Sequence, residues 1–347
     1  MSDIGIDILL PEAQELLAKA GAVISGDRVR FDPEMVIEHV AKAPNEFLLE
    51  ARNPDHSVMI GGDHVVFAAV ASPPNAGDIA GGRRTGNQAD FRNLVRLSQH
   101  LNAIQINAGY PVEPANIHAS VRHLHAIRDL LVLTDKAVNA YSLGADRNRD
   151  ALEIVRLAHG LNEHEIDDHT IVHPIINTSF ALAGAMAPVT IAGAVVQQNA
   201  EALAGICLTQ LVRAGAPVVY GGFTSNVDMR SGSPAFGTPE FMQSLVVDDA
   251  SMALEAIADV GPGGHFFGTQ HTQDRYKNAL FAPMVSDWRN FESWEEAGAP
   301  TADPKLSRLY PELLAEYEAP AIDPERLAAI EEFVARRVLE GGVATDY

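Results

Sequence analysis

Residues 180–240 read FALAGAMAPVTIAGAVVQQNAEALAGICLTQLVRAGAPVVYGGFTSNVDMRSGSPAFGTPE and decide the fold of this chain. The stretch predicts the end of a strand, a loop with glycine, methionine and proline, a helix, a second strand and a second glycine-rich loop. We expect the helix to begin after Pro188 with Thr190 as its N-cap. It should end at Arg213, because Gly215 follows as a stop signal.

The strand predicted next, residues 217–222, is a short apolar run without alternation. This pattern is typical of a strand that is covered on both faces in a parallel sheet. The strand opens into the loop FTSNVDMRSGSPAFG. Loops that follow parallel strands are where α/β proteins place their binding and catalytic groups, so we expect the functional site there.

Further strand–helix pairs precede this stretch. Strands are predicted over 65–72, 103–110, 137–143 and 170–177, and helices over 90–100, 118–133 and 149–160. Strand centres about 30 to 40 residues apart are typical of successive βα units, which favours a TIM-type (β/α) barrel. We therefore predict an N-terminal helical and β extension over 1–64, a barrel over 65–260, and a C-terminal motif with a helical extension over 261–347.

Two places interrupt this repeat. Residues 170–177 run almost directly into a strand end at 180–184, although parallel strands need a crossover of about a dozen residues. After residue 237, a single helix over 239–260 precedes the segment GPGGHFFG. Either the chain is a truncated variant, or its segments are joined across residues missing from the sequence. We favour the second interpretation, which predicts chain breaks near 176–179 and between 242 and 250.

Composition excludes several classes of protein. The net charge of −21 argues against nucleic acid and anionic membranes as partners. Cys207, the one cysteine, lies among apolar residues and is interpreted as a buried small side chain. No apolar run is long enough to cross a bilayer, and the first residues lack the pattern of a signal peptide. We expect a cytoplasmic protein.

Several motifs of the chain resemble the trimethylamine methyltransferase family. They are AGAMAPVTIAGA, QNAEALAG, TQLVRAGAPVVYG and the pair DMRSG and FGTPE, with GPGGHFFGTQHT at 261–272 and LLAEYEAPAIDPE at 313–325. The resemblance implies transfer of a methyl group from a small quaternary or tertiary amine to the cobalt of a corrinoid (cobalamin) that a partner protein carries. It also implies methylamine metabolism related to methanogenesis, and members longer than this chain at both irregular places.

Aromatic residues at or after predicted strand ends suggest a site for a quaternary ammonium. Such a cation has no hydrogen to donate, and aromatic faces and a distant carboxylate hold it. The glycines beside His265 let the backbone approach a ligand closely, and Arg230 and His265 are candidate donors for a betaine carboxylate. The candidate substrate-binding residues are Tyr110, Glu113, Tyr141, Phe223, Met229, Arg230, Phe236, His265 and Phe266. Core packing remains the competing interpretation for each aromatic residue alone.

Because no pyrrolysine is present, the chain resembles the members of the family that act on glycine betaine. The resemblance identifies no catalytic residue, and we expect no metal of the protein's own and a homo-oligomer. Two alternatives stay open. The first is a degenerate, non-catalytic family member that binds a ligand. The second is a zinc-dependent hydrolase on the same barrel, which the absence of a clustered ligand motif among the histidines disfavours.

Overall fold

The computed structural model describes residues 1–69, 71, 73–78, 81–139, 144–171, 175–179, 182–183, 185–188, 190–222, 225–227, 234–235, 269–275, 291–298 and 302–345. The chain divides into two compact units. One unit consists of Met1–Ser179, Asn199–Gly221 and Leu309–Tyr347, and the other of Phe180–Gln198 and Gly222–Arg308. Neither unit coincides with the predicted segments 1–64, 65–260 and 261–347, which stay a prediction.

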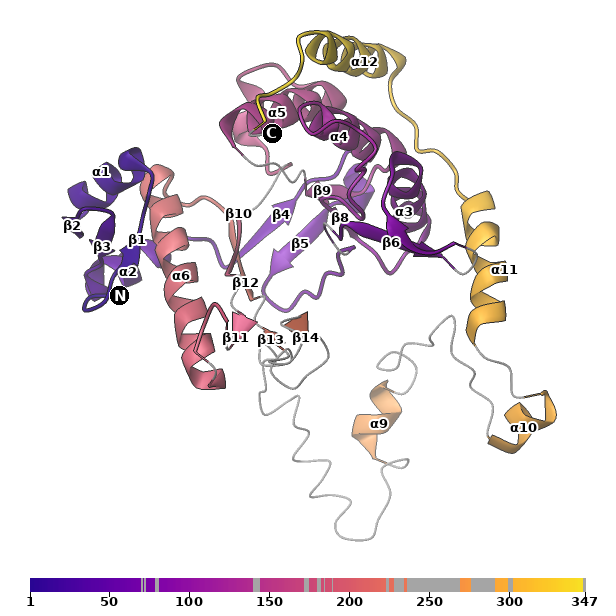
Figure 1. Ribbon diagram of the computed structural model, residues 1–347, viewed down its shortest axis with the longest axis horizontal. Helices are drawn as coiled ribbons and strands as arrows, with labels where there is room; N and C mark the ends of the chain where they lie inside the picture. The colour runs from indigo at the N-terminus through magenta and orange to yellow at the C-terminus, as the bar shows by residue number, and fades with distance from the viewer. Residues whose placement is uncertain are drawn as a thin grey trace. The chain divides into compact units, whose positions relative to one another are not determined.

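Helices and short strands alternate along the described residues (Figure 1). The helices are α1 (Pro11–Lys19), α2 (Pro33–Val40), α3 (Gln88–His100), α4 (Arg122–Leu133), α5 (Ala145–His159), α6 (Ile191–Val212), α9 (Gln270–Arg275), α10 (Phe291–Glu296), α11 (Ala302–Ala315) and α12 (Pro324–Leu339). The strands are β1 (Ile6–Asp7), β2 (Val23–Ser25), β3 (Arg28–Arg30), β4 (Glu46–Leu49), β5 (Val58–Gly61), β6 (Asn75–Asp78), β7 (Gly82–Thr85), β8 (Ile106–Ala108), β9 (Ala137–Asn139), β10 (Ile175–Ser179), β11 (Leu182–Ala183), β12 (Val218–Gly222), β13 (Ser225–Val227) and β14 (Pro234–Ala235).

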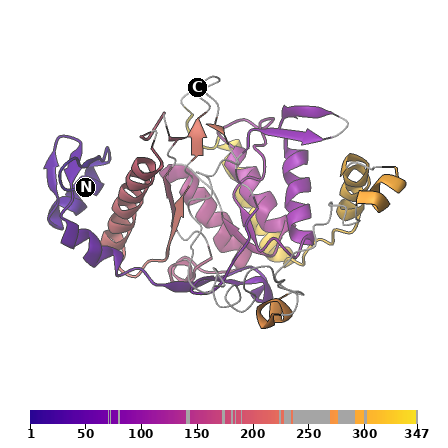
Figure 2. The same ribbon diagram turned by 90° about the horizontal axis from the view of Figure 1, so that it is seen from below.

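The N-terminal segment consists of two helices around a hairpin. The strands form an antiparallel sheet in the order β1-β3-β2. The Asp32 carboxylate caps α2 by accepting hydrogen bonds from the backbone of Glu34 and Met35. Phe31 and Leu17 pack with Cys207, so α6 covers this segment, and Figure 2 shows the indigo N-terminal segment beside that helix.

Two parallel strand pairings follow in the central part of the chain. Ala68 forms a parallel bridge with Ile106, and β8 pairs in parallel with β9, with Asn107 opposite Val138. Because α3 lies between the first two strand positions and α4 between β8 and β9, these are strand–helix–strand units. The Asn87 and Asp90 side chains form a capping box that fixes the start of α3.

A layer of helices encloses the main hydrophobic core. Phe91 of α3, Leu124 and Ile127 of α4, Ile154 of α5 and Ile330 of α12 are fully buried in one cluster. Figure 1 shows α12 lying across α4 and α5, which it contacts directly. The helical layer therefore joins segments that are about 200 residues apart in the sequence.

The helix predicted after Pro188 is confirmed. It is α6, and the Thr190 hydroxyl accepts a hydrogen bond from the backbone of Gly193, as an N-cap does. Cys207 is fully buried within it, as predicted, and burial raises the pKa of its thiol. Gly215 has a φ of 80°, the left-handed conformation expected after a helix.

Two expectations about strands are wrong. The strand at 217–222 is not covered on both faces, because β12 pairs with β10 in a two-stranded sheet and Tyr220 is 49% exposed. The chain runs without a break through β10, where a break was expected near 176–179. The second expected break, between 242 and 250, lies outside the described residues.

The described part of the chain is mixed α/β with small sheets. Each of its sheets contains two or three strands, and none of them closes into a barrel. No helix within the described ranges is long and apolar enough to cross a membrane.

Candidate functional site

The parallel strands β8 and β9 end side by side, and this edge is the best-described candidate site. The last paired residues are Ala108 and Asn139. The backbone N–H of Gly109 then donates to the carbonyl oxygen of Asn139 at 2.8 Å. Gly109 has a φ of 60°, so the chain turns sharply away from the strand at a position that favours glycine. Carboxyl ends of parallel strands are the usual location of ligand sites in α/β proteins.

The two faces of this strand pair meet different surroundings. Ile106 and Ala137 belong to a small apolar cluster with the hairpin formed by β4 and β5. Val138 belongs to the main core under the helices. Because side chains alternate along a strand, Asn139 lies on the same face as Ala137, away from the helical layer. Its Oδ1 atom is buried and has no hydrogen-bond partner.

Two of the predicted site residues follow β8 directly. The Tyr110 side chain is 6% exposed and lies in the main core, where its ring meets Phe91 edge to face at a centroid distance of 5.8 Å. Glu113 is partly buried and accepts a hydrogen bond from Arg122 at 2.7 Å. Both residues are thus engaged in packing or pairing at the start of the loop after β8.

The other predicted site residues cannot be placed. Tyr141, Phe223, Met229, Arg230, Phe236, His265 and Phe266 lie outside the described residues. The prediction that Tyr110, Phe223, Met229, Phe236 and His265 line one cavity therefore stays a prediction.

A hairpin holds the loop after β8. Strands β6 and β7 pair antiparallel, and the backbone N–H of Glu113 donates to the Pro73 carbonyl just before the hairpin at 2.9 Å. Gly86, just after the hairpin, packs so closely that an added Cβ would approach Val112 to 2.4 Å. Arg84 in β7 pairs with Asp90 and Asp78. This rim is fixed by backbone hydrogen bonds and ion pairs together with the burial of Val112 in the main core.

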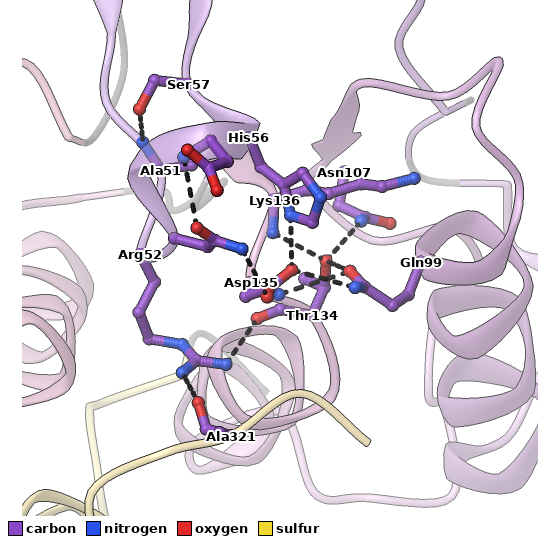
Figure 3. A network of polar contacts seen from close by, with 12 residues as sticks. Ala51, Arg52, His56, Ser57, Gln99, Asn107, Thr134, Asp135, Lys136 and Ala321 are labelled. Carbon is purple, nitrogen blue, oxygen red and sulfur yellow. Dashed lines mark hydrogen bonds and ion pairs between the residues drawn. The ribbon is translucent and has the colours of Figure 1, made fainter. Parts of the chain in front are cut away.

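The opposite, N-terminal end of the same strands carries a network of polar contacts (Figure 3). The ammonium group of Lys136 is buried and donates to the carbonyl oxygens of Ser98, Leu101 and Ile104 at 2.8, 2.9 and 2.7 Å. These carbonyls lie at and beyond the C-terminus of α3, where the helix dipole favours a cation. Burial lowers the pKa of Lys136, and Asp135 offsets part of that effect.

Asp135 is the second centre of this network. Its carboxylate accepts hydrogen bonds from His56 at 2.7 Å, from Gln99 at 2.9 Å and from Asn53 at 3.3 Å. Burial alone would raise the pKa of Asp135, but these hydrogen bonds outweigh it and the pKa is lowered. Arg52 adds a bond to the carbonyl oxygen of Thr134 and thereby joins the β4–β5 hairpin to the start of β9.

Two further polar groups lie in the helical layer. The Nε2–H of His123 donates to the Asp150 carboxylate at 2.9 Å, and Arg337 of α12 donates to both oxygens of the same carboxylate at 2.7 and 3.1 Å. A cavity of about 280 Å³ lies between α3, α4 and α12, with Arg92, His125, Arg128 and Glu331 among its lining residues. Its arginines are already paired, since both bind the buried Asp129. Both groups dock the helices of this layer.

Within the described residues, no three His, Cys, Asp or Glu side chains come together in a way that could hold a metal ion. Sequence reasoning missed two residues that the structure makes important, Lys136 and Asn139. Lys136 precedes a strand and Asn139 lies in the middle of a predicted one, so neither stands in a motif. The alternation of β9 could have assigned a face to Asn139, but not its missing partner.

Comparison with known proteins gives matches over almost the whole chain. The sequence profile of the family described as Trimethylamine methyltransferase (MTTB) matches residues 1–179, 172–248 and 241–342. The glycine betaine methyltransferase of Desulfitobacterium hafniense (strain Y51) is 26% identical over 99% of this chain and 94% of its own length. The trimethylamine methyltransferase MttB of D. hafniense is 25% identical over 68% of this chain and 53% of its own length. The proline betaine:corrinoid methyltransferase of Eubacterium limosum is 31% identical over 32% of this chain and 22% of its own length.

The match to the glycine betaine methyltransferase also shows that this chain is shorter than that relative. The alignment with the glycine betaine methyltransferase spans 453 positions, whereas this chain has 347 residues, so many positions of the relative face no residue here. The matched segments of the family profile meet at residues 172–179 and 241–248. These are the two places at which the sequence interrupts the strand–helix repeat.

Proposed function

Because the chain belongs to the trimethylamine methyltransferase family, we propose that it is a methyltransferase that acts on a small quaternary amine. The methyl acceptor in this proposal is the cobalt of a corrinoid on a separate protein, and the name of the proline betaine relative supports a corrinoid as the acceptor. The observation that carries the proposal is the similarity to a glycine betaine methyltransferase over 99% of the chain. Glycine betaine is therefore the first substrate to test.

The proposal places this reaction at the carboxyl ends of the strands. A (β/α) barrel is built from successive parallel strand pairings. The two pairings described here, of Ala68 with β8 and of β8 with β9, therefore support a TIM-type fold. The pocket would be completed by the loops after the later strands, with Phe223, Met229, Phe236 and His265 as its candidate residues. Aromatic faces are suited to a cation that carries no N–H group.

The proposed methyl transfer requires few catalytic groups from the protein itself. A quaternary nitrogen leaves as a neutral tertiary amine, so its departure needs no general acid. The corrinoid supplies the nucleophilic cobalt that takes the methyl group. The residues of this chain hold one N-methyl group in line with the acceptor and keep water out, which is catalysis by positioning.

A second candidate is a family member that binds the amine but transfers no methyl group. The observation that favours it is the number of positions of the glycine betaine methyltransferase that face no residue of this chain. If the lost segments carry part of the pocket or of the docking surface for the corrinoid protein, binding could survive without catalysis. No observation on the described residues favours the zinc hydrolase alternative.

One experiment separates these candidates. Glycine betaine is titrated into the protein by calorimetry, and methyl transfer is followed with a reduced corrinoid protein by absorbance and by the appearance of dimethylglycine. Binding with formation of dimethylglycine is expected for the methyltransferase. Binding without it identifies a non-catalytic family member, and the absence of binding for glycine betaine, proline betaine and trimethylamine overturns both candidates.

A further inference from the structure

Two asparagines on neighbouring parallel strands share an unusual property. Asn107 lies in β8 and Asn139 in β9, and each has a buried Oδ1 atom without a hydrogen-bond partner. Buried polar atoms in folded proteins almost always have a partner, so each such atom calls for an explanation. The two residues offer a matched comparison, because they have the same side chain in neighbouring strands of one sheet.

The two side chains lie on opposite faces of the sheet. Asn107 is opposite Val138 in the parallel register and shares its face, which is covered by the helices. Its Nδ2 atom donates to the Thr134 hydroxyl at 3.2 Å, so this side chain is fixed at the base of the helical layer. Asn139 shares the other face with Ala137 and ends β9 at the carboxyl edge.

The described residues around Asn139 offer its side-chain oxygen no hydrogen-bond donor. Among the described residues, its side chain makes no hydrogen bond or ion pair, whereas its backbone carbonyl is bound by Gly109. Asparagine is unfavourable in a strand, and burying its amide group without a partner costs free energy. A valine at this position would avoid both costs. A polar group that is expensive for the fold and lies at a ligand edge is a candidate binding group.

We propose that Asn139 contacts the cationic end of the bound amine through its carbonyl oxygen. The proposal rests on the function proposed above. A quaternary ammonium spreads its positive charge over the hydrogens of its methyl groups, and an amide oxygen accepts such C–H groups at short range. The oxygen carries partial negative charge without being ionised, so it would favour a cation over a neutral group of the same shape. Asn139 would thereby set the specificity of the site for charge.

The test compares two ligands and three variants by calorimetry. The ligands are glycine betaine and 3,3-dimethylbutyrate, which has the same shape but a carbon in place of the charged nitrogen. The variants are Asn139→Asp, Asn139→Leu and the matched control Asn107→Leu, whose side chain lies on the other face. The readout is the ratio of the two affinities, because a merely structural role would change both affinities together and leave the ratio unchanged.

The expected results differ in direction. Asn139→Asp should raise the preference for glycine betaine by about threefold or more, because a full negative charge replaces a partial one. Asn139→Leu should lower it by about two- to tenfold, the range of one lost polar contact. Asn107→Leu should have the same ratio of the two affinities as the protein without substitutions.

Three outcomes have separate meanings. If the unchanged protein binds glycine betaine with preference and both Asn139 variants keep the same ratio, the role of Asn139 is overturned while the proposed function stands. If Asn107→Leu shifts the ratio as far as Asn139→Leu, the effect does not depend on the face of the sheet and the assignment is also overturned. If the unchanged protein binds neither glycine betaine nor other amines, the proposed function fails and this inference fails with it.

Discussion

The two ends of the β8–β9 pair differ in how their polar groups are satisfied. At the N-terminal end, Lys136 and Asp135 each make three hydrogen bonds to the protein. At the C-terminal end, Asn139 keeps a buried oxygen without a partner. One strand pair can therefore have its polar groups satisfied at one end and an unsatisfied group at the other, which is the end where α/β proteins usually place their ligand sites.

Lys136→Met should have the largest effect on this comparison. The variant keeps most of the apolar stem but removes the ammonium group that donates to the carbonyls of Ser98, Leu101 and Ile104, of which Leu101 keeps the backbone N–H of Ile104 as a donor. Unsatisfied buried carbonyls are costly, so we expect the free energy of unfolding to fall by about 3 kcal/mol. The measurement is urea denaturation, with Lys42→Met as control, since Lys42 forms a surface ion pair with Glu38. Equal losses in the two variants would contradict the structural role of Lys136.

Asp135→Asn should have the next largest effect. It keeps the shape but removes the charge that accepts from His56, Gln99 and Asn53, and we expect a loss of about 2 kcal/mol at pH 7. Because the pKa of Asp135 is lowered in the folded protein, its contribution is present above the unfolded pKa and is lost as pH falls through the folded pKa.

The unchanged protein should therefore lose more stability than Asp135→Asn on acidification below about pH 4, the usual range of an aspartate. Unfolding curves measured from pH 7 to pH 2 test this difference. The exposed Asp55 provides the control, as Asp55→Asn. Parallel pH profiles for the unchanged protein and Asp135→Asn would count against the network.

His159 should give the same end of the strands a second pH dependence, at milder acidity. Burial, reinforced by the positive charge of Arg52, lowers the pKa of His159 to about 4. The unfolded chain binds a proton at about pH 6.5 while the folded protein does not, so stability falls as pH drops from about 6.5 to 4. His159→Gln should flatten this part of the profile, and His164→Gln, which changes an exposed histidine, should not.

The smallest effect is expected at the C-terminal rim. Glu113→Gln weakens a partly exposed ion pair with Arg122, and such pairs contribute less than about 1 kcal/mol to stability. Thermal or urea unfolding measures the loss, which should stay well below that of Asp135→Asn. A loss as large as that of Asp135→Asn would show that both ends of the strand pair are equally important for stability, and the contrast between them would disappear.

Sequence reasoning predicted the elements whose signals are local. The limits of α6 follow from Thr190 and Gly215, and the burial of Cys207 follows from its apolar neighbours in the sequence. The resemblance to the family is confirmed by the profile match. The two interruptions of the repeat, seen in the sequence, fall where the matched segments meet.

Features that depend on tertiary contacts could not be predicted from the sequence. The apolar run of 217–222 indicated a strand covered on both faces, but coverage depends on neighbours that the run itself does not encode. Lysine side chains are usually exposed to solvent, so the sequence gives no sign that Lys136 is buried. Its burial is explained only by the carbonyl groups at and beyond the end of α3, which the fold brings close to it. Tyr110 follows a predicted strand, as a ligand-binding aromatic would, yet it meets Phe91 in the core. Position after a strand alone does not distinguish these two roles.

The docking of α12 has a consequence for the synthesis of the protein. Arg128 of α4 binds Glu331, which lies 203 residues later in the chain, and Asp150 of α5 binds Arg337, which lies 187 residues later. At ribosomal rates the α4 surface waits on the order of 10 to 40 seconds for its partner. During that interval the surface that will receive Ile330 and Val334 is open to solvent and to other nascent chains. The helical layer can therefore be completed only late in translation, and protection by chaperones would matter most in that interval.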